Sequence, residues 1–175
     1  MSKSASPSTA LPIARFLLQL LILGNWIMAV VILVLLLALP NERWIMSAFK
    51  LSPSPDAHRV VLALRAIATL GLAAIPLNYL ALKRLLDIVE TVRSGNPFVA
   101  ANAHRLRAIA WALLALQLLS IVIGGIARAV STPSHPIHLD AGFSINGWLA
   151  VLLTFLLARV FAEGAVMRAD LEGTV

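Results

Sequence analysis

The chain alternates between long apolar stretches and short polar ones, and the apolar stretches carry almost no charge. Residues 16–41, 108–127 and 141–158 contain no charged side chain, and residues 60–82 contain only Arg65. About 20 apolar residues in a helix cross a hydrocarbon core of roughly 30 Å, and a helix satisfies its own backbone hydrogen bonds there. The pattern therefore predicts an all-α polytopic membrane protein with four transmembrane helices. These are expected near residues 14–39, 56–93, 97–128 and 145–170.

The polar stretches connect these helices within a single domain over residues 1–175. Residues 1–10 are rich in Ser, Ala and Pro, a composition typical of disorder. The second and third helices are longer than a membrane requires, so they are expected to continue as a cytosolic hairpin over residues 83–107. The remaining segments are predicted to be outer loops at 40–55 and 129–144 and a cytosolic tail at 163–175.

Composition supports a membrane protein and removes several other classes. Hydrophobic residues make up 60% of the chain, charged residues make up 13%, and the mean hydropathy is +0.91. Soluble domains are about 45–50% apolar and about 25% charged, so a freely soluble globule and a disordered chain are both excluded. The absence of Cys excludes a disulfide framework, a thiolate zinc site and cysteine catalysis.

The distribution of Lys and Arg predicts how the chain is oriented. Nine of these residues fall on the side of the two termini and four fall on the other side. The positive-inside rule then places both termini in the cytoplasm. The nine are Lys3, Arg15, Lys83, Arg84, Arg93, Arg105, Arg107, Arg159 and Arg168, and the four are Arg43, Lys50, Arg59 and Arg128. Because these charges follow membrane margins, direct binding of nucleic acid is not expected despite the net charge of +6.

The connection between the second and third predicted helices is the most informative polar stretch. Gly95 suits the left-handed position after a helix end, Asn96 can cap the next helix, and Pro97 can occupy its first position. These three residues predict a tight structural turn. Phe98 is expected to pack back against the apolar face at 89–92.

Residues that follow the turn make the hairpin a candidate docking surface. Phe98, Asn102, Leu106 and Ile109 are spaced to share one stripe of a helix, and Arg105 lies within the same segment. Two interpretations remain open. The hairpin folds on itself for structural reasons, or Phe98, Asn102 and Arg105 dock a cytosolic partner.

Polar residues inside the predicted spans are candidate functional sites, because placing them in lipid is costly. Asn25 and Gln117 lie near the middle of the first and third helices, and Arg65 lies in the outer half of the second. Arg65 can snorkel towards Asp140 or the headgroups, pair within the protein, or bind an anion or a lipid headgroup. Asn25 and Gln117 can link helices by hydrogen bonds or, with Arg65, line a polar path.

Familiar catalytic and metal-binding patterns do not occur in the chain. A Ser-His-Asp set, an H-E-x-x-H helix and a phosphate-binding loop are absent. His135, His138 and Asp140 form an H-x-x-H-x-D run, but Pro136 separates the histidines and no helix is predicted to fix them. We therefore expect no catalytic residue, no metal and no cofactor.

Two sequence motifs lie in or next to the predicted cytosolic hairpin and tail. The central one is Gly95-Asn96-Pro97-Phe98 followed by Asn102, Leu106 and Ile109, and the closing one is the run VFAEGAVMRADLEGTV at residues 160–175. With the layout of four spans, these motifs resemble a bacterial membrane family known as domain of unknown function 2975. The residues of the closing motif that match are Gly164, Arg168, Asp170, Leu171, Glu172, Thr174 and Val175.

The resemblance implies a small four-helix protein of the bacterial inner membrane that has no established activity. It also implies a gene that often lies beside that of a small helix-turn-helix transcription factor. Such a regulator is therefore an expected partner, beside the lipid bilayer and further copies of the chain in a homo-oligomer. The tail supplies candidate docking residues, since a partner can recognise a helix end and a free carboxylate. These are Arg168, Asp170, Leu171, Glu172 and Val175.

Two functions follow from these observations. The first is a non-enzymatic membrane regulator or anchor that docks the transcription factor on the hairpin and tail. The second is a subunit of an oligomeric transporter or channel, or a membrane protein that binds a lipid or an anion. Side-chain direction separates the two, because a transporter needs the intramembrane polar residues to converge on one cavity.

Overall fold

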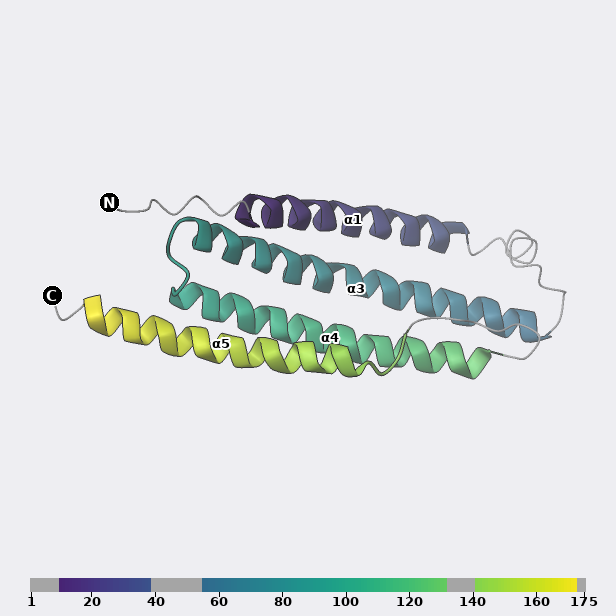
Figure 1. Cartoon of the computed structure of the whole chain (residues 1–175). Helices are drawn as coiled ribbons and strands as arrows, with labels where there is room; N and C mark the ends of the chain where they lie inside the picture. The colour runs from purple at the N-terminus through teal and green to yellow at the C-terminus, as the bar shows by residue number, and fades with distance from the viewer. Residues whose placement is uncertain (1–9, 39–54, 132–140, 173–175) are drawn as a thin grey trace.

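The computed structural model describes residues 10–38, 55–131 and 141–172, and most of them are helical. The helices are α1 (Ala10–Ala38), α3 (Pro55–Arg93), α4 (Ala100–Val130) and α5 (Ile145–Glu172). The prediction of an all-α chain with four long helices is confirmed (Figure 1). The predictions for residues 1–9, for the loop at 40–54 and for the run at 135–140 fall outside the described residues.

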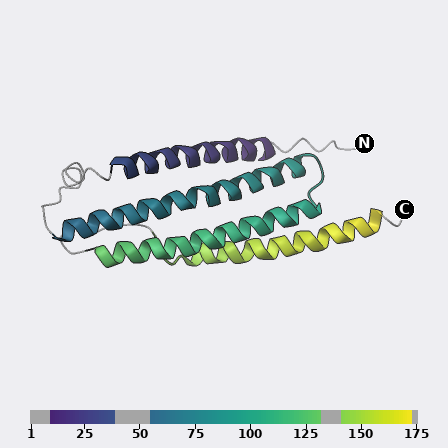
Figure 2. The same ribbon diagram turned by 180° about the vertical axis from the view of Figure 1, so that it is seen from behind.

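The helices lie side by side and pack in chain order. α1 packs against α3, α3 against α4, and α4 against α5, so α1 and α5 form the two edges of the arrangement (Figures 1 and 2). The start of α1, the turn between α3 and α4 and the end of α5 lie at the same end of the molecule (Figure 1). We call this the hairpin end. α5 extends past the turn in both views.

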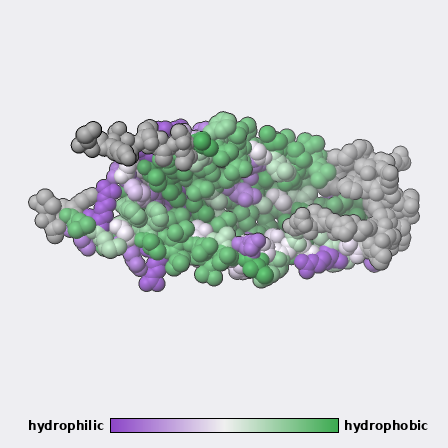
Figure 3. All heavy atoms as spheres, viewed as in Figure 1, coloured by the Kyte–Doolittle hydropathy of each residue, from purple (hydrophilic) through white to green (hydrophobic). Residues whose placement is uncertain are grey.

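The outer surface of the helices is apolar enough to require lipid. All four helices are long and hydrophobic enough to cross a membrane, and only 6% of the most apolar part of α1 is buried. Large apolar side chains such as Leu21, Leu33 and Leu152 are exposed, and the middle of the visible face is largely hydrophobic (Figure 3). A soluble monomer does not expose so much contiguous apolar surface. The chain is therefore an integral, multi-pass membrane protein.

The core is best formed towards the hairpin end, where three helices meet. Ile88 of α3, Leu106 and Ile109 of α4 and Ala158 of α5 are buried together, and Phe161 packs against them. The predicted stripe of α4 is thus confirmed for its two aliphatic residues. A separate cluster joins α1 to α3 near the other end through Ile32, Leu36, Val61, Leu64 and Ala68.

The turn between α3 and α4 ends α3 in a Schellman motif. Gly95 has a φ of 82°, its N–H donates to the Val92 carbonyl at 3.1 Å, and the Asn96 N–H donates to the Thr91 carbonyl at 3.0 Å. The left-handed role predicted for Gly95 is confirmed. The prediction that Asn96 caps α4 and Pro97 opens it is wrong, because α4 begins at Ala100 after Val99 in an extended conformation.

The connection into α5 runs back along α4 before the helix begins. The Gly142 N–H donates to the Ser120 hydroxyl at 3.1 Å, and the Gln117 amide donates to the Ser144 carbonyl at 3.3 Å. Both partners on α4 lie well before its end at Val130. Residues 141–144 are therefore non-helical backbone beside a membrane-spanning helix, where polar side chains must replace water as hydrogen-bond partners.

Candidate functional site

The side chain of Asn102 joins the two arms of the hairpin. It is fully buried, with 0% of its surface exposed. Its amide nitrogen donates to the Thr91 hydroxyl at 2.7 Å and to the Pro97 carbonyl at 2.8 Å, and the Thr91 hydroxyl donates in turn to the Ile88 carbonyl at 2.7 Å. One amide therefore ties the end of α3 to the non-helical residues that precede α4.

Arg105 completes this network from one turn further along α4. Its guanidinium donates to the Asn102 side-chain oxygen at 2.8 Å and to the Asp87 carbonyl at 3.4 Å. Both polar atoms of the buried amide are thus satisfied, as burial requires. Asn102 and Arg105 were predicted as docking residues, but their side chains are directed into the hairpin.

The end of α5 is seated on the hairpin by an aromatic pair and a glycine. The rings of Phe98 and Phe161 lie 5.3 Å apart between centroids. A Cβ added at Gly164 would lie 3.0 Å from the Phe98 ring, so the absence of a side chain there lets the ring approach α5. The sequence predicted a partner for Phe98 on α3, whereas the ring contacts found here are with α5.

A polar contact connects the same two motifs. The Arg168 guanidinium donates to the Asn96 side-chain oxygen at 3.0 Å, across 72 residues of sequence. Asn96 therefore binds the end of α5 with the side chain that was predicted to cap α4. The motifs at 95–102 and 160–171 form one structural unit, a relation that the sequence alone did not reveal.

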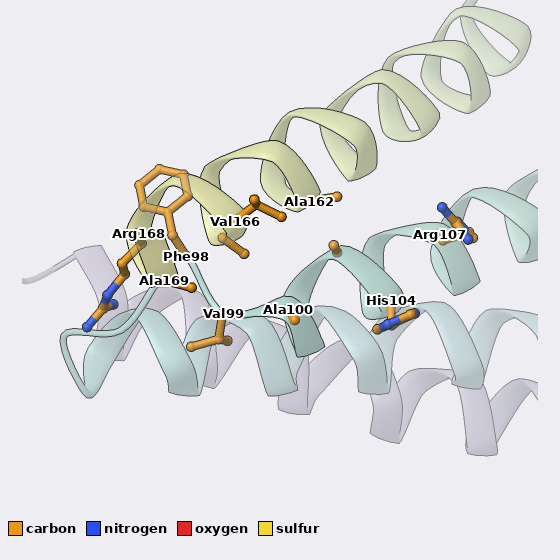
Figure 4. Close-up of a pocket in the computed structure, with 11 residues that line it drawn as sticks. Phe98, Val99, Ala100, His104, Arg107, Ala162, Val166, Arg168 and Ala169 are labelled. Atoms are coloured by element: carbon orange, nitrogen blue, oxygen red, sulfur yellow. The ribbon is translucent and has the colours of Figure 1, made fainter. Parts of the chain in front are cut away.

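A groove of about 570 Å³ lies between α4 and α5 at this unit. Its walls are apolar, from Phe98, Val99, Val166 and several alanines, and its basic residues are His104, Arg107 and Arg168. Side chains from the two helices face each other across it (Figure 4). The described residues that line it include no Asp or Glu. We call it the motif groove.

The predicted docking residues divide into three groups. Phe98 and Arg168 line the motif groove, whereas Asn102 and Arg105 support it from inside the hairpin. Asp170 and Leu171 are exposed on the last turns of α5. The side chain of Glu172 and the whole of Val175 lie outside the described residues. His104 and Arg107, which sequence reasoning missed as groove residues, share a spacing of three that places them on one face of α4.

The three predicted intramembrane polar residues contact different parts of the molecule. The Asn25 amide donates to the Ile75 carbonyl of α3 at 3.2 Å, next to the helix proline Pro76, and Gln117 binds the connection before α5. Arg65 is 19 residues from Arg84 along α3, about 28 Å of helix, so it lies near the far boundary of a membrane that begins at Arg84. The structure therefore does not gather Asn25, Gln117 and Arg65 into one site.

A second groove, of about 720 Å³, lies among all four helices, and its lining residues belong to the four candidate membrane spans. Most of its lining is aliphatic, and its polar residues are Asn25, Asn78 and Thr154. Asn78 is an amide within an apolar run of α3, and such a run does not indicate the direction in which a side chain points. We call this cavity the membrane groove.

Metal ligands do not cluster in the described parts of the chain: no group of three or more His, Asp or Glu side chains is placed to hold an ion there. The His135, His138 and Asp140 run lies outside the described residues.

Comparison with known proteins identifies the family of the chain. The model of a family described as protein of unknown function, DUF2975, matches residues 20–175. The chain belongs to DUF2975. The resemblance predicted from the two motifs is confirmed, and the match includes every residue of the motif unit. No curated protein and no solved structure matches the chain. The two family motifs therefore meet at one site of this chain. Because the family is described only as of unknown function, the function of that site must be inferred from its chemistry.

Proposed function

We propose that this DUF2975 protein is a non-enzymatic regulator or anchor of the bacterial inner membrane. In this proposal the hairpin end faces the cytoplasm and holds a small helix-turn-helix transcription factor. The excess of Lys and Arg at the hairpin end supports that orientation. The class of partner follows from the family resemblance, and the place of docking follows from the site.

The observation that carries the proposal is the motif groove. It is concave, lined mainly by apolar groups, and bordered by three basic residues without an acidic one among the described lining residues. A partner that fits it would insert an apolar anchor flanked by acidic side chains, since buried anchors supply affinity and complementary charge guides association. An exposed amphipathic helix of a small DNA-binding protein has this chemistry.

The positions of the charged residues support a site beyond the lipid, as docking of a cytosolic protein requires. Arg107 and Arg159 mark the polar end of the membrane-crossing parts of α4 and α5. Groove residues on α5 lie between Ala162 and Ala169, three to ten residues further on, or about 5–15 Å along the helix axis. The motif groove therefore extends from the headgroup layer into water.

Crosslinking and copurification of the tagged full-length protein from its own cells test this proposal. Arg107→Glu reverses a charge in the motif groove, and Arg159→Glu reverses an equivalent charge on the solvent side of α5, where Arg159 is exposed and pairs with Glu163 at 3.0 Å. We expect a helix-turn-helix protein to be recovered with the wild type and with Arg159→Glu. Recovery should fall about tenfold with Arg107→Glu, since an unfavourable buried charge costs a kcal/mol or more.

A combined variant tests both motifs at once. Phe98→Ala with deletion of residues 171–175 removes the aromatic wall and the tail, and it should abolish recovery. If the partner stays bound to this variant, or if Arg107→Glu and Arg159→Glu behave alike, the docking proposal is wrong. The alternative of a transporter or channel subunit predicts flux of ions or small anions through liposomes that contain the purified wild type.

A further inference from the structure

The membrane groove opens between the two edge helices. Leu20, Leu21 and Gly24 of α1 form one side, and Thr154 and Leu157 of α5 form the other. A Cβ added at Gly24 would have no heavy atom of another element within 4 Å, so the space beside this part of α1 is open. The cavity of about 720 Å³ extends from the charged boundary at the hairpin end inwards to Asn25, and a mainly apolar lining favours an apolar occupant.

The polar residues of the groove differ in whether their side chains have hydrogen-bond partners. Asn25 donates to the Ile75 carbonyl at 3.2 Å, and the Thr154 hydroxyl donates to the Ala150 carbonyl at 2.7 Å. Asn78, by contrast, has no hydrogen-bond partner among the residues that the structure describes, yet its side chain lines the groove. An amide without a partner in hydrocarbon is unfavourable. The occupant is therefore expected to carry a polar group that pairs with Asn78.

The depth of the Asn78 and Asn25 amides in the membrane indicates which class of lipid can pair with them. Asn78 lies five residues from Lys83 and Asn25 lies ten from Arg15, which corresponds to about 8 Å and 15 Å inside the boundary at the hairpin end. Phospholipid headgroups and esters remain near the membrane surface, and their acyl chains cannot pair with an amide at these depths. An isoprenoid quinone combines a long hydrocarbon tail with uncharged ring carbonyls that enter the hydrocarbon core.

We propose that the membrane groove binds an isoprenoid quinone, with a ring carbonyl accepting a hydrogen bond from the Asn78 amide. The isoprenoid tail lies against the leucines of α1 and α4. The side-chain oxygen of Asn25 is not used in the hydrogen bond to Ile75. It can accept a hydrogen bond from the hydroxyl of the reduced quinone. Binding requires no covalent or redox step by the protein.

The test uses the full-length protein in phospholipid nanodiscs that lack quinone. Decylubiquinone is added, and its affinity is measured from the bound fraction in native mass spectra. We expect one quinone per chain, at least tenfold weaker binding by Asn78→Leu, and a similar loss with Gly24→Leu, whose Cβ enters open space beside the groove. Gln19→Leu is the matched control, because it removes an exposed amide of α1 that does not line the groove.

Circular dichroism of each variant shows whether the helices are retained, so that a loss of binding is assigned to the groove. Equal quinone binding by Asn78→Leu and the wild type would overturn the proposal and indicate simple partition into the nanodisc. Phospholipid adducts that decylubiquinone does not displace would overturn it in favour of a phospholipid. A dimer that requires Asn78 would overturn it in favour of a second copy of the chain.

Discussion

Asn102 shows how one side chain can organise a turn between two membrane helices. Its amide reaches Thr91 on one arm, the Pro97 carbonyl in the turn and Arg105 on the other arm. A hydrophobic residue at this position would fill the space but would remove the hydrogen bonds to all three of these polar partners. The side chain is therefore a structural support of the motif groove, although its place in the family motif first suggested an exposed docking residue.

Replacing this amide should destabilise the hairpin more than replacing an exposed one. Asn102→Ala is expected to lower the free energy of unfolding by about 2–3 kcal/mol, because buried partners lose their hydrogen bonds, and to lower the melting temperature by about 5–10 °C. Asn146→Ala, at an exposed position of α5, should change neither. Thermal circular dichroism in detergent micelles measures both variants, and equal melting curves would contradict the assigned role.

Among the elements, α5 differs from the other helices in how it enters the membrane. From Ile145 to Arg159 it has 14 residue steps, or about 21 Å of helix, which is less than a hydrocarbon core of roughly 30 Å. Residues 141–144 supply the remaining distance as non-helical backbone along α4. Gln117 and Ser120 satisfy its polar groups, so these two α4 residues serve as hydrogen-bond partners of a non-helical segment.

Close packing of this segment on α4 depends on Gly124. A Cβ at Gly124 would overlap the Ala141 carbonyl, whereas a Cβ at Gly125 would have no neighbour within 4 Å. Gly124→Ala should therefore cost about 1–3 kcal/mol of stability through overpacking, and Gly125→Ala should have little effect or raise the stability slightly. Melting temperatures of the two variants, measured side by side in one detergent, provide the comparison. A Gly124→Ala protein as stable as Gly125→Ala would contradict this packing.

For the whole molecule, orientation decides which compartment meets the motif groove. The hairpin end carries Arg93, Arg107 and Arg168 together with the ion pair between Arg15 and Glu90 at 3.6 Å. The opposite end has fewer basic residues. The positive-inside rule therefore favours a cytoplasmic hairpin end, which is the side on which a transcription factor is found.

The natural absence of Cys makes this orientation simple to test. Ser94→Cys places a thiol in the α3–α4 turn, and Ser131→Cys places one at the far end of α4, both at exposed positions. In intact spheroplasts, a membrane-impermeant maleimide should label Ser131→Cys, whereas Ser94→Cys should react only after permeabilisation. The reverse pattern would place the motif groove outside the cytoplasm and rule out a cytosolic partner.

The contacts between distant segments of the candidate site could not be predicted from the sequence, because they depend on how the helices pack. Gly95 was assigned correctly because its role depends on local backbone conformation. Asn96 and Phe98 were assigned to local partners, but they bind Arg168 and Phe161 on a helix more than 60 residues away. The direction of Asn78 within its helix was likewise undefined, because nearly every position around it is apolar and hydrophobic periodicity then loses its meaning.

The sequence by itself determined the number and approximate limits of the helices, the left-handed turn at Gly95 that follows α3, and the apolar character that requires a membrane. These properties depend on the length of charge-free runs and on local conformational preference, so they can be read along the chain. The tertiary structure alone decided that two motifs at 95–102 and 160–171 meet, that Asn102 faces inwards and that Asn78 faces a groove. Those features depend on which helix faces pack together, and lipid-exposed helices that are apolar all round do not encode that choice in their pattern.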